Sequence, residues 1–151
     1  MAGVVITQRA SGLQELADRL NALAQADFGE ALAQIGATVQ TQTRHRLADE
    51  KEAPDGSAWA PLTAAWQQRK AEKSSGGLLE YEGKLIDSIA SEVSGDAVEI
   101  GSHLIYAAIH QMGGEPVGKP IPARPYLGLS GDNENELREV ISAWLDQLMA
   151  P

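Results

Sequence analysis

Apolar residues recur at helical spacing along the first third of the chain. Leucine and alanine follow this period over residues 13–24, after a capping box predicted at residues 11–14. A second capping box, at residues 27–30, precedes another periodic stretch that we expect to run from residue 28 to about residue 48. Two amphipathic helices in succession favour an α-hairpin.

The same period returns near the C-terminus and predicts the clearest helix of the chain. We expect Asp132 or Asn133 to cap its first turn. One continuous apolar face follows, made of Leu137, Val140, Ile141, Trp144, Leu145 and Leu148.

Residues between these helices predict a small sheet. The segments 88–94 and 97–101 flank the dipeptide Gly95-Asp96, which is typical of a tight β-hairpin. Residues 84–89 suit a short helix or the entry to a strand, and residues 4–7 suit a short edge strand. The chain is therefore predicted to be α+β, with the N-terminal helical hairpin and the C-terminal helix packed on a small, mainly antiparallel sheet.

The remaining segments predict short helices joined by loops. Short helices are expected over residues 63–71 and 103–111, the second of them buried. Polar loops are expected at residues 49–58 and 72–77. Residues 112–119 hold three glycines and a proline and predict irregular structure.

Residues 121–129 contain two prolines, so we expect an extended segment at or beside a sheet edge rather than a central strand. Gly113 and Gly114 are predicted to end the preceding helix with positive φ. Both Trp59 and Trp66 are expected in the core.

The composition is that of one globular domain, which we assign to residues 1–151. The net charge is −9, from 21 acidic and 12 basic residues. The largest basic cluster is Arg69, Lys70 and Lys73, which is too small for a duplex-binding face. The charge therefore argues against direct, sequence-specific nucleic-acid binding.

Neither membrane insertion nor secretion is indicated by the sequence. No apolar run approaches the roughly 18 residues of a membrane helix, and the first seven residues lack the features of a signal peptide. There is no cysteine, which excludes disulfides and Cys-ligated zinc. We expect a cytoplasmic protein.

Candidate catalytic groups are few. His103 and His110 are seven residues apart with no acidic residue suitably placed between them, a poor spacing for zinc ligands, and His45 stands apart from both. No nucleophile elbow, phosphate loop or dinucleotide turn occurs. We predict a protein without catalytic, metal or cofactor residues. A small hydrolase and an acidic adaptor protein remain the alternatives.

The most distinctive stretch is residues 100–130. Its motifs are Ile100-Gly101, Tyr106-Ala107, His110-Gln111-Met112-Gly113 and Pro122-Ala123-Arg124-Pro125-Tyr126-Leu127-Gly128. With Trp59 and the Gly-x-Leu-x-x-Ser motif at residues 83–88, this order resembles the phage virion morphogenesis family, the tail-completion proteins of Mu-like and other contractile-tailed phages. The resemblance covers about residues 28–150.

The resemblance implies a structural protein that acts at the head-proximal end of a phage or prophage tail, in tail completion and head–tail joining. It implies assembly in the host bacterial cytoplasm, other tail or neck proteins as partners, and a homo-oligomeric ring. A similar motif order occurs in a broader group of head–tail connector proteins, so a neck position is the alternative. The candidate contact residues are Tyr106, His110, Gln111, Arg124 and Tyr126.

Overall fold

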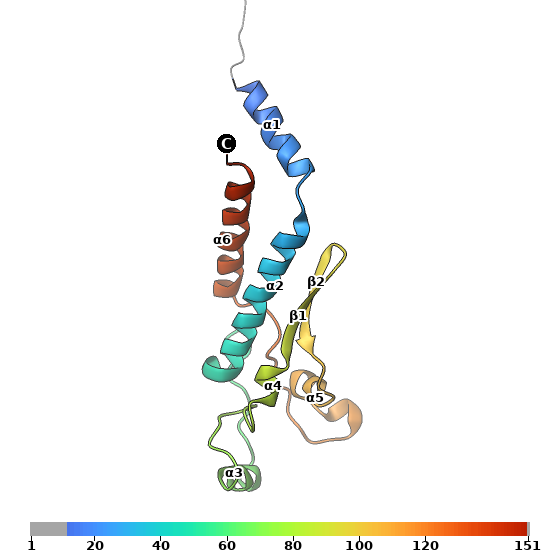
Figure 1. The fold of residues 1–151 in the computed structure, drawn as a ribbon. Helices are drawn as coiled ribbons and strands as arrows, with labels where there is room; N and C mark the ends of the chain where they lie inside the picture. Colours follow the sequence, from blue (N-terminus) through green and yellow to red (C-terminus); the bar gives the residue numbers. More distant parts are fainter. Residues whose placement is uncertain (1–11, 151) are drawn as a thin grey trace, which may run out of the picture.

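The computed structural model describes residues 12–150 and confirms the α+β class (Figure 1). The expected strand at residues 4–7 lies outside the described residues. In chain order the elements are α1 (Leu13–Ala24), α2 (Phe28–His45), α3 (Ala64–Ala71), α4 (Lys84–Asp87), β1 (Ile89–Ser94), β2 (Ala97–Ser102), α5 (Ala107–Met112) and α6 (Gly131–Leu148).

Helix α2 is the central element. Its start matches the prediction in part. The Asp27 side chain caps the helix by accepting a hydrogen bond from the Gly29 N–H at 2.8 Å, but Glu30 accepts one from Gln34 and does not complete the expected capping box. After His45 the helical stretch continues through one π-helical turn, Arg46–Glu50. It ends at Lys51, whose φ of 57° is left-handed. The helical stretch therefore reaches the end that the sequence predicts.

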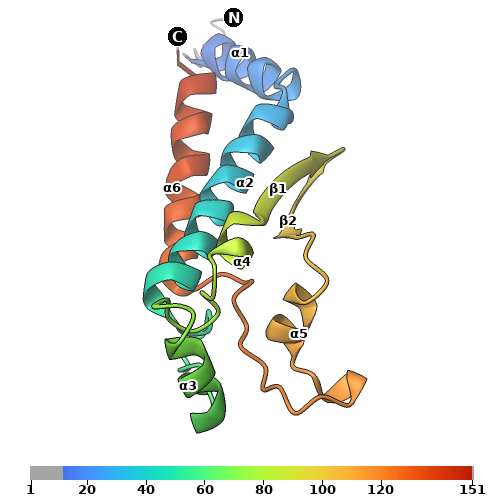
Figure 2. The ribbon, with the colours of Figure 1, turned by 60° about the horizontal axis from the view of Figure 1, so that its bottom comes forward.

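The hairpin and α6 pack on two sides of α2 (Figures 1 and 2). Strands β1 and β2 are antiparallel, with Ser94 opposite Ala97 across the turn, as predicted. They approach α2 closely at Gly36, where an added Cβ would lie 2.7 Å from a Val98 methyl group. On the other side the rings of Phe28 and Trp144 are 5.5 Å apart. The C-terminal helix thus packs on α2 rather than directly on the sheet.

Helix α1 differs from the expected arrangement. It extends beyond the start of α2 instead of returning along it, so these two helices form no hairpin (Figure 1). None of its residues is buried, although the leucines follow a helical stripe. Its N-cap is Gly12, without a side-chain cap, and Gln14 instead donates a hydrogen bond to Asp18. Ser11, the other half of the expected capping box, lies outside the described residues.

Helix α6 begins slightly earlier than predicted. Ser130 is the N-cap, and its side chain accepts a hydrogen bond from the Asn133 N–H at 3.2 Å. The Asn133 side chain in turn accepts one from the Ser130 N–H at 3.2 Å. Neither Asp132 nor Asn133 is itself the cap. Asn133 is the second half of a capping box, a role that asparagine can take because its amide oxygen accepts like a carboxylate.

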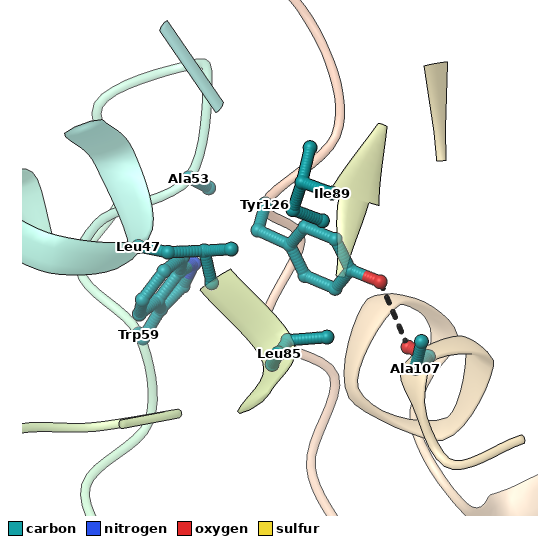
Figure 3. Close-up of a cluster of buried hydrophobic side chains, with 7 residues drawn as sticks. All are labelled: Leu47, Ala53, Trp59, Leu85, Ile89, Ala107 and Tyr126. Carbon is teal, nitrogen blue, oxygen red and sulfur yellow. Dashed lines mark hydrogen bonds between the residues drawn. The ribbon is translucent and has the colours of Figure 1, made fainter. Parts of the chain in front are cut away.

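The core lies where the π-helical turn, β1, α5 and the extended segment meet (Figure 3). Its buried members are Leu47, Ala53, Trp59, Leu85, Ile89, Ala107 and Tyr126. Trp59 is there as predicted. The prediction for Trp66 is wrong: this side chain is 57% exposed on α3, which buries no residue.

The segments around α5 are less regular than expected. The helix begins at Ala107 rather than at residue 103, and only Ala107 is buried within it. It ends at Gly113, whose φ of 85° confirms the predicted reversal, whereas Gly114 has a negative φ of −95°. A single 3₁₀ turn, Glu115–Val117, follows. Residues 121–129 are extended but pair with no strand. The sheet of the described residues consists of β1 and β2 alone.

Candidate interaction surface

The extended segment 121–130 cannot rely on a strand ladder for its backbone hydrogen bonds. Its prolines at 122 and 125 have no N–H to donate. Buried backbone groups still need partners. In this protein side chains and the end of α5 supply them, and we call this set of contacts the clasp.

Gln111 provides one half of the clasp. Its Oε1 accepts hydrogen bonds from the N–H groups of Tyr126 and Leu127, both at 2.9 Å. Its Nε2 donates to the Leu127 carbonyl at 3.3 Å. A single amide therefore satisfies three backbone groups, much as a neighbouring strand would. One main-chain bond adds to this, from the Arg124 N–H to the His110 carbonyl at 2.7 Å.

Arg124 is buried, with 4% of its surface exposed. Its Nε donates to the Ala60 carbonyl at 2.7 Å and its Nη2 to the Pro61 carbonyl at 3.0 Å. No carboxylate among the described residues pairs with it. Arg124 thus ties the extended segment to residues 60–61, just after Trp59, within its own chain.

Tyr126 anchors the same segment in the core. It is 1% exposed, and its hydroxyl donates to the Ala107 carbonyl at 3.2 Å (Figure 3). The Trp59 indole N–H donates to the Pro125 carbonyl at 2.8 Å. Burial raises the pKa of Tyr126, so the phenol remains the donor of this bond at neutral pH.

Arg46 is the clasp residue that the sequence did not indicate. Its Nη1 donates to the carbonyls of Tyr126 and Gly128, at 3.1 and 2.8 Å. Its Nη2 donates to the side-chain oxygen of Asn133, and its Nε lies 3.3 Å from a Glu50 carboxylate oxygen without hydrogen-bond geometry. A basic residue near the C-terminal end of a helix is favourable there through the helix dipole alone, so its position in the sequence gives no sign of these buried contacts.

His110 sits between the clasp and the surface. Its ring meets that of Tyr106 edge-on, with centroids 5.9 Å apart. Burial lowers the pKa of His110, and the nearby positive charge of Arg124 lowers it further. The imidazole is therefore neutral at pH 7 and contributes packing rather than charge.

Beside the clasp, α5 and the residues around it expose several large apolar side chains. Ile105 is 97% exposed, Tyr106 41%, Met112 69% and Val117 60%. These four residues, which we call the α5 surface, lie within 13 positions of the chain. Where such side chains form a contiguous patch, they are typical of a contact with another protein.

Within residues 12–150 no group of three or more His, Asp or Glu residues is placed to hold a metal ion. Over the same part of the chain, no helix has the length and apolar character needed to cross a membrane.

The sequence profile of the phage virion morphogenesis family matches residues 8–146, nearly the whole chain, including every residue of the clasp. The chain belongs to the phage virion morphogenesis family.

Individual relatives agree with this assignment. The chain is 38% identical over 104 residues to the putative capsid assembly protein G of Escherichia phage Mu, an alignment that covers 66% of each protein and so just under two thirds of the relative. It is 29% identical over 129 residues to the Mu-like prophage FluMu G protein 1 of Haemophilus influenzae, covering 83% of this chain and 86% of the relative. No solved structure matches.

Family membership and the relatives support a structural role in phage virion assembly. The relatives carry names of assembly and prophage proteins rather than of enzymes. Of the five candidate contact residues of this family member, only Tyr106 is classed as exposed. His110 and Gln111 are half-buried, and Arg124 and Tyr126 are buried within the chain.

The clasp predicts a measurable loss of stability in this family member. Replacing Gln111 by alanine leaves three backbone groups without their partner, at about 1 kcal/mol each. We expect Gln111→Ala to lower the free energy of unfolding by about 2–3 kcal/mol, measured by urea denaturation.

The matched control for this substitution is Gln67→Ala. Gln67 is exposed on α3, and its side chain makes one hydrogen bond within the described residues, to the Leu62 carbonyl at 3.2 Å. This variant is expected to change the stability by less than about 0.5 kcal/mol. Equal effects of the two substitutions would show that Gln111 does not hold the extended segment.

Proposed function

We propose that this protein acts at the head-proximal end of a phage tail, where it completes the tail and joins it to a filled head. The observation that carries the proposal is the family match over residues 8–146. The Mu and Mu-like origin of the relatives supports it. A position in the neck is the nearest variant of the same role.

In this proposal the clasp and the α5 surface have different tasks. The α5 surface contacts other tail or neck proteins, with Tyr106 as a direct contact. Gln111, Arg124 and Tyr126 are positioning residues, because their bonds hold the extended segment and α5 in place from inside the chain. The work takes place in the host cytoplasm during virion assembly, and the subunit is part of a ring.

The glycine-rich residues 112–120 extend this surface, and we propose that they and the loops at residues 50–57 and 72–77 are fixed in one conformation on contact with neighbours. Ordering costs free energy at the moment of binding, which offsets part of the contact energy. Such coupling restrains assembly until the correct partner is present.

A second candidate function follows from the name of the phage Mu relative, a putative capsid assembly protein. Here the protein would help to build the head rather than to finish the tail. The two functions predict different defects when the gene is missing.

Deletion of the gene from its phage, followed by electron microscopy of induced lysates, tests the proposal. If the protein completes tails, filled heads and separate tails accumulate without joining. Missing or misshapen heads beside normal tails would overturn the proposal in favour of capsid assembly. Complementation with Ile105→Glu is expected to reproduce the deletion, because Ile105 contributes to the α5 surface and supports no core. Complementation with Val93→Glu, at an exposed hairpin position, is expected to restore infectivity.

A further inference from the structure

Helix α3 combines an exposed tryptophan with basic side chains. Trp66 is 57% exposed, and the guanidinium carbon of Arg69 lies 5.7 Å from the centre of its ring. Trp66, Arg69 and Lys70 are spaced i, i+3 and i+4, so they share one face of the helix. Lys73 follows in the turn after α3. We call these four residues the basic face.

Most other cations of the described residues are used within the fold. Arg46 and Arg124 are buried and bind carbonyls, and Arg44 binds two carbonyls. Four more have a carboxylate oxygen within 4.0 Å: Arg19, Lys51, Lys84 and Arg138. By contrast, the described residues supply no carboxylate partner for Arg69 or Lys73. Lys70, the third cation of the basic face, donates a hydrogen bond to the Gly77 carbonyl and has no carboxylate partner among the described residues. The chain thus keeps positive charge on α3 while carrying a net charge of −9.

A complementary stripe lies on α6. Asp132, Glu139 and Asp146 recur every seven residues, which puts them on one line along the helix. This line is opposite the side that carries Trp144 toward α2. All three are exposed, and none forms an ion pair within residues 12–150. We call these residues the acidic stripe.

The two surfaces are separated within one molecule. Helix α3 lies at one end, whereas α6 runs along the flank of α2 toward the other end (Figures 1 and 2). A contact between them therefore joins two copies through different surfaces. Contacts of this kind repeat from subunit to subunit, and they close into a ring when the rotation allows it.

We propose that the basic face of one copy docks on the acidic stripe of α6 in a second copy. Trp66 and Arg69 are residue types that dominate binding energy at interfaces, and the stacked arginine is already held in place before contact. The alternative pairings of two basic faces or two acidic stripes bring like charges together and are disfavoured.

The area of the two surfaces limits how strongly two copies are expected to associate. A stable interface buries about 800 Å² on each partner, and one short helix against one stripe supplies only part of that area. Association of the purified chain should therefore be weak and should weaken further as salt screens the charges. The inference deepens the proposed function by naming a second copy as one partner. It is tested on purified protein, so its failure would leave the virion role standing.

The experiment is sedimentation equilibrium of the full chain over a concentration series at low and at high salt. Wild-type protein should associate, more strongly at low salt. Arg69→Glu and Glu139→Arg should each weaken association at least about tenfold, because each places like charges across the contact. Lys84→Glu is the matched control, since it reverses a charge whose one ion pair within residues 12–150 is with Glu82, and it should leave association unchanged.

Exchanging the charges of positions 69 and 139 shows whether the variants lose association through this contact or through a change in the net charge of the protein. A mixture of the Arg69→Glu and Glu139→Arg proteins should associate better than either alone, because every contact between the two different variants joins opposite charges at these positions. The double variant R69E/E139R should recover association for the same reason. The proposal is overturned if Lys84→Glu weakens association as much as Arg69→Glu, if the exchanged charges restore nothing, or if the wild-type chain stays monomeric throughout.

Discussion

Replacing Arg46 by methionine should be among the most destabilising substitutions in this protein, lowering the free energy of unfolding by about 3–5 kcal/mol. Methionine retains much of the volume of the arginine stem but none of its donors. The carbonyl of Tyr126 and the side chain of Asn133 would lose their partner in a buried place, and the carbonyl of Gly128 would lose its partner in a partly buried one. Glu50 would also lose the cation beside it. Urea denaturation measures the loss directly.

Arg138→Met is the matched control for this prediction. The side chain of Arg138 is 67% exposed and pairs with Glu134 one turn away on α6. An exposed pair of this kind contributes little, so the stability should change by less than about 0.5 kcal/mol. A small effect at Arg46 as well would mean that water replaces the lost donors and that the clasp does not depend on the guanidinium. The two outcomes therefore separate a buried structural cation from a surface one.

The periodic parts of the sequence predicted the fold well. Residues 28–48 have the apolar period of a helix and an aspartate that caps it, and the structure confirms both. The dipeptide at 95–96 predicted the hairpin, because few other residue pairs close so tight a turn. These features depend on neighbours in sequence, so a single chain read by itself is enough to find them.

Arrangement was harder to predict than the elements themselves. The leucine stripe of α1 shows that one face is available for burial, but not which surface would bury it. The same limit explains α5: Ile105 is apolar and lies in an apolar stretch, so it was included in a buried helix, yet it is almost fully exposed. Both errors involve apolar residues that the single chain does not cover.

The clasp could be predicted only in part. The motif residues around Arg124 were found by resemblance to the family, without the contacts that they make. Arg46 is 80 residues from the Tyr126 carbonyl that it binds, and side chain to backbone bonds over such distances leave no periodic pattern. Buried arginines are rare enough that a charge beside a helix end is more naturally assigned to the surface.

The two tryptophans show most clearly that a local sequence pattern does not determine which side chains are buried. Both lie in similar surroundings in the sequence, seven positions apart, and both were expected in the core. Trp59→Ala should lower the free energy of unfolding by about 3–5 kcal/mol, since it empties a buried site and removes the donor to the Pro125 carbonyl. Trp66→Ala should change it by less than about 0.5 kcal/mol, because the ring is exposed and supports no core residue.

Thermal unfolding and sedimentation of the same two variants test both assignments together. For a chain of this size, the loss at Trp59 corresponds to a fall in Tm of roughly 6–20 °C, with little change at Trp66. Association should follow the opposite order: Trp66→Ala should weaken contacts between copies while the fold stays intact. If Trp66→Ala also unfolds at a much lower temperature, α3 contributes to the core of the single chain, and its basic face is then structural. If neither stability nor association changes, Trp66 takes no part in the contact and the charged residues alone must carry it.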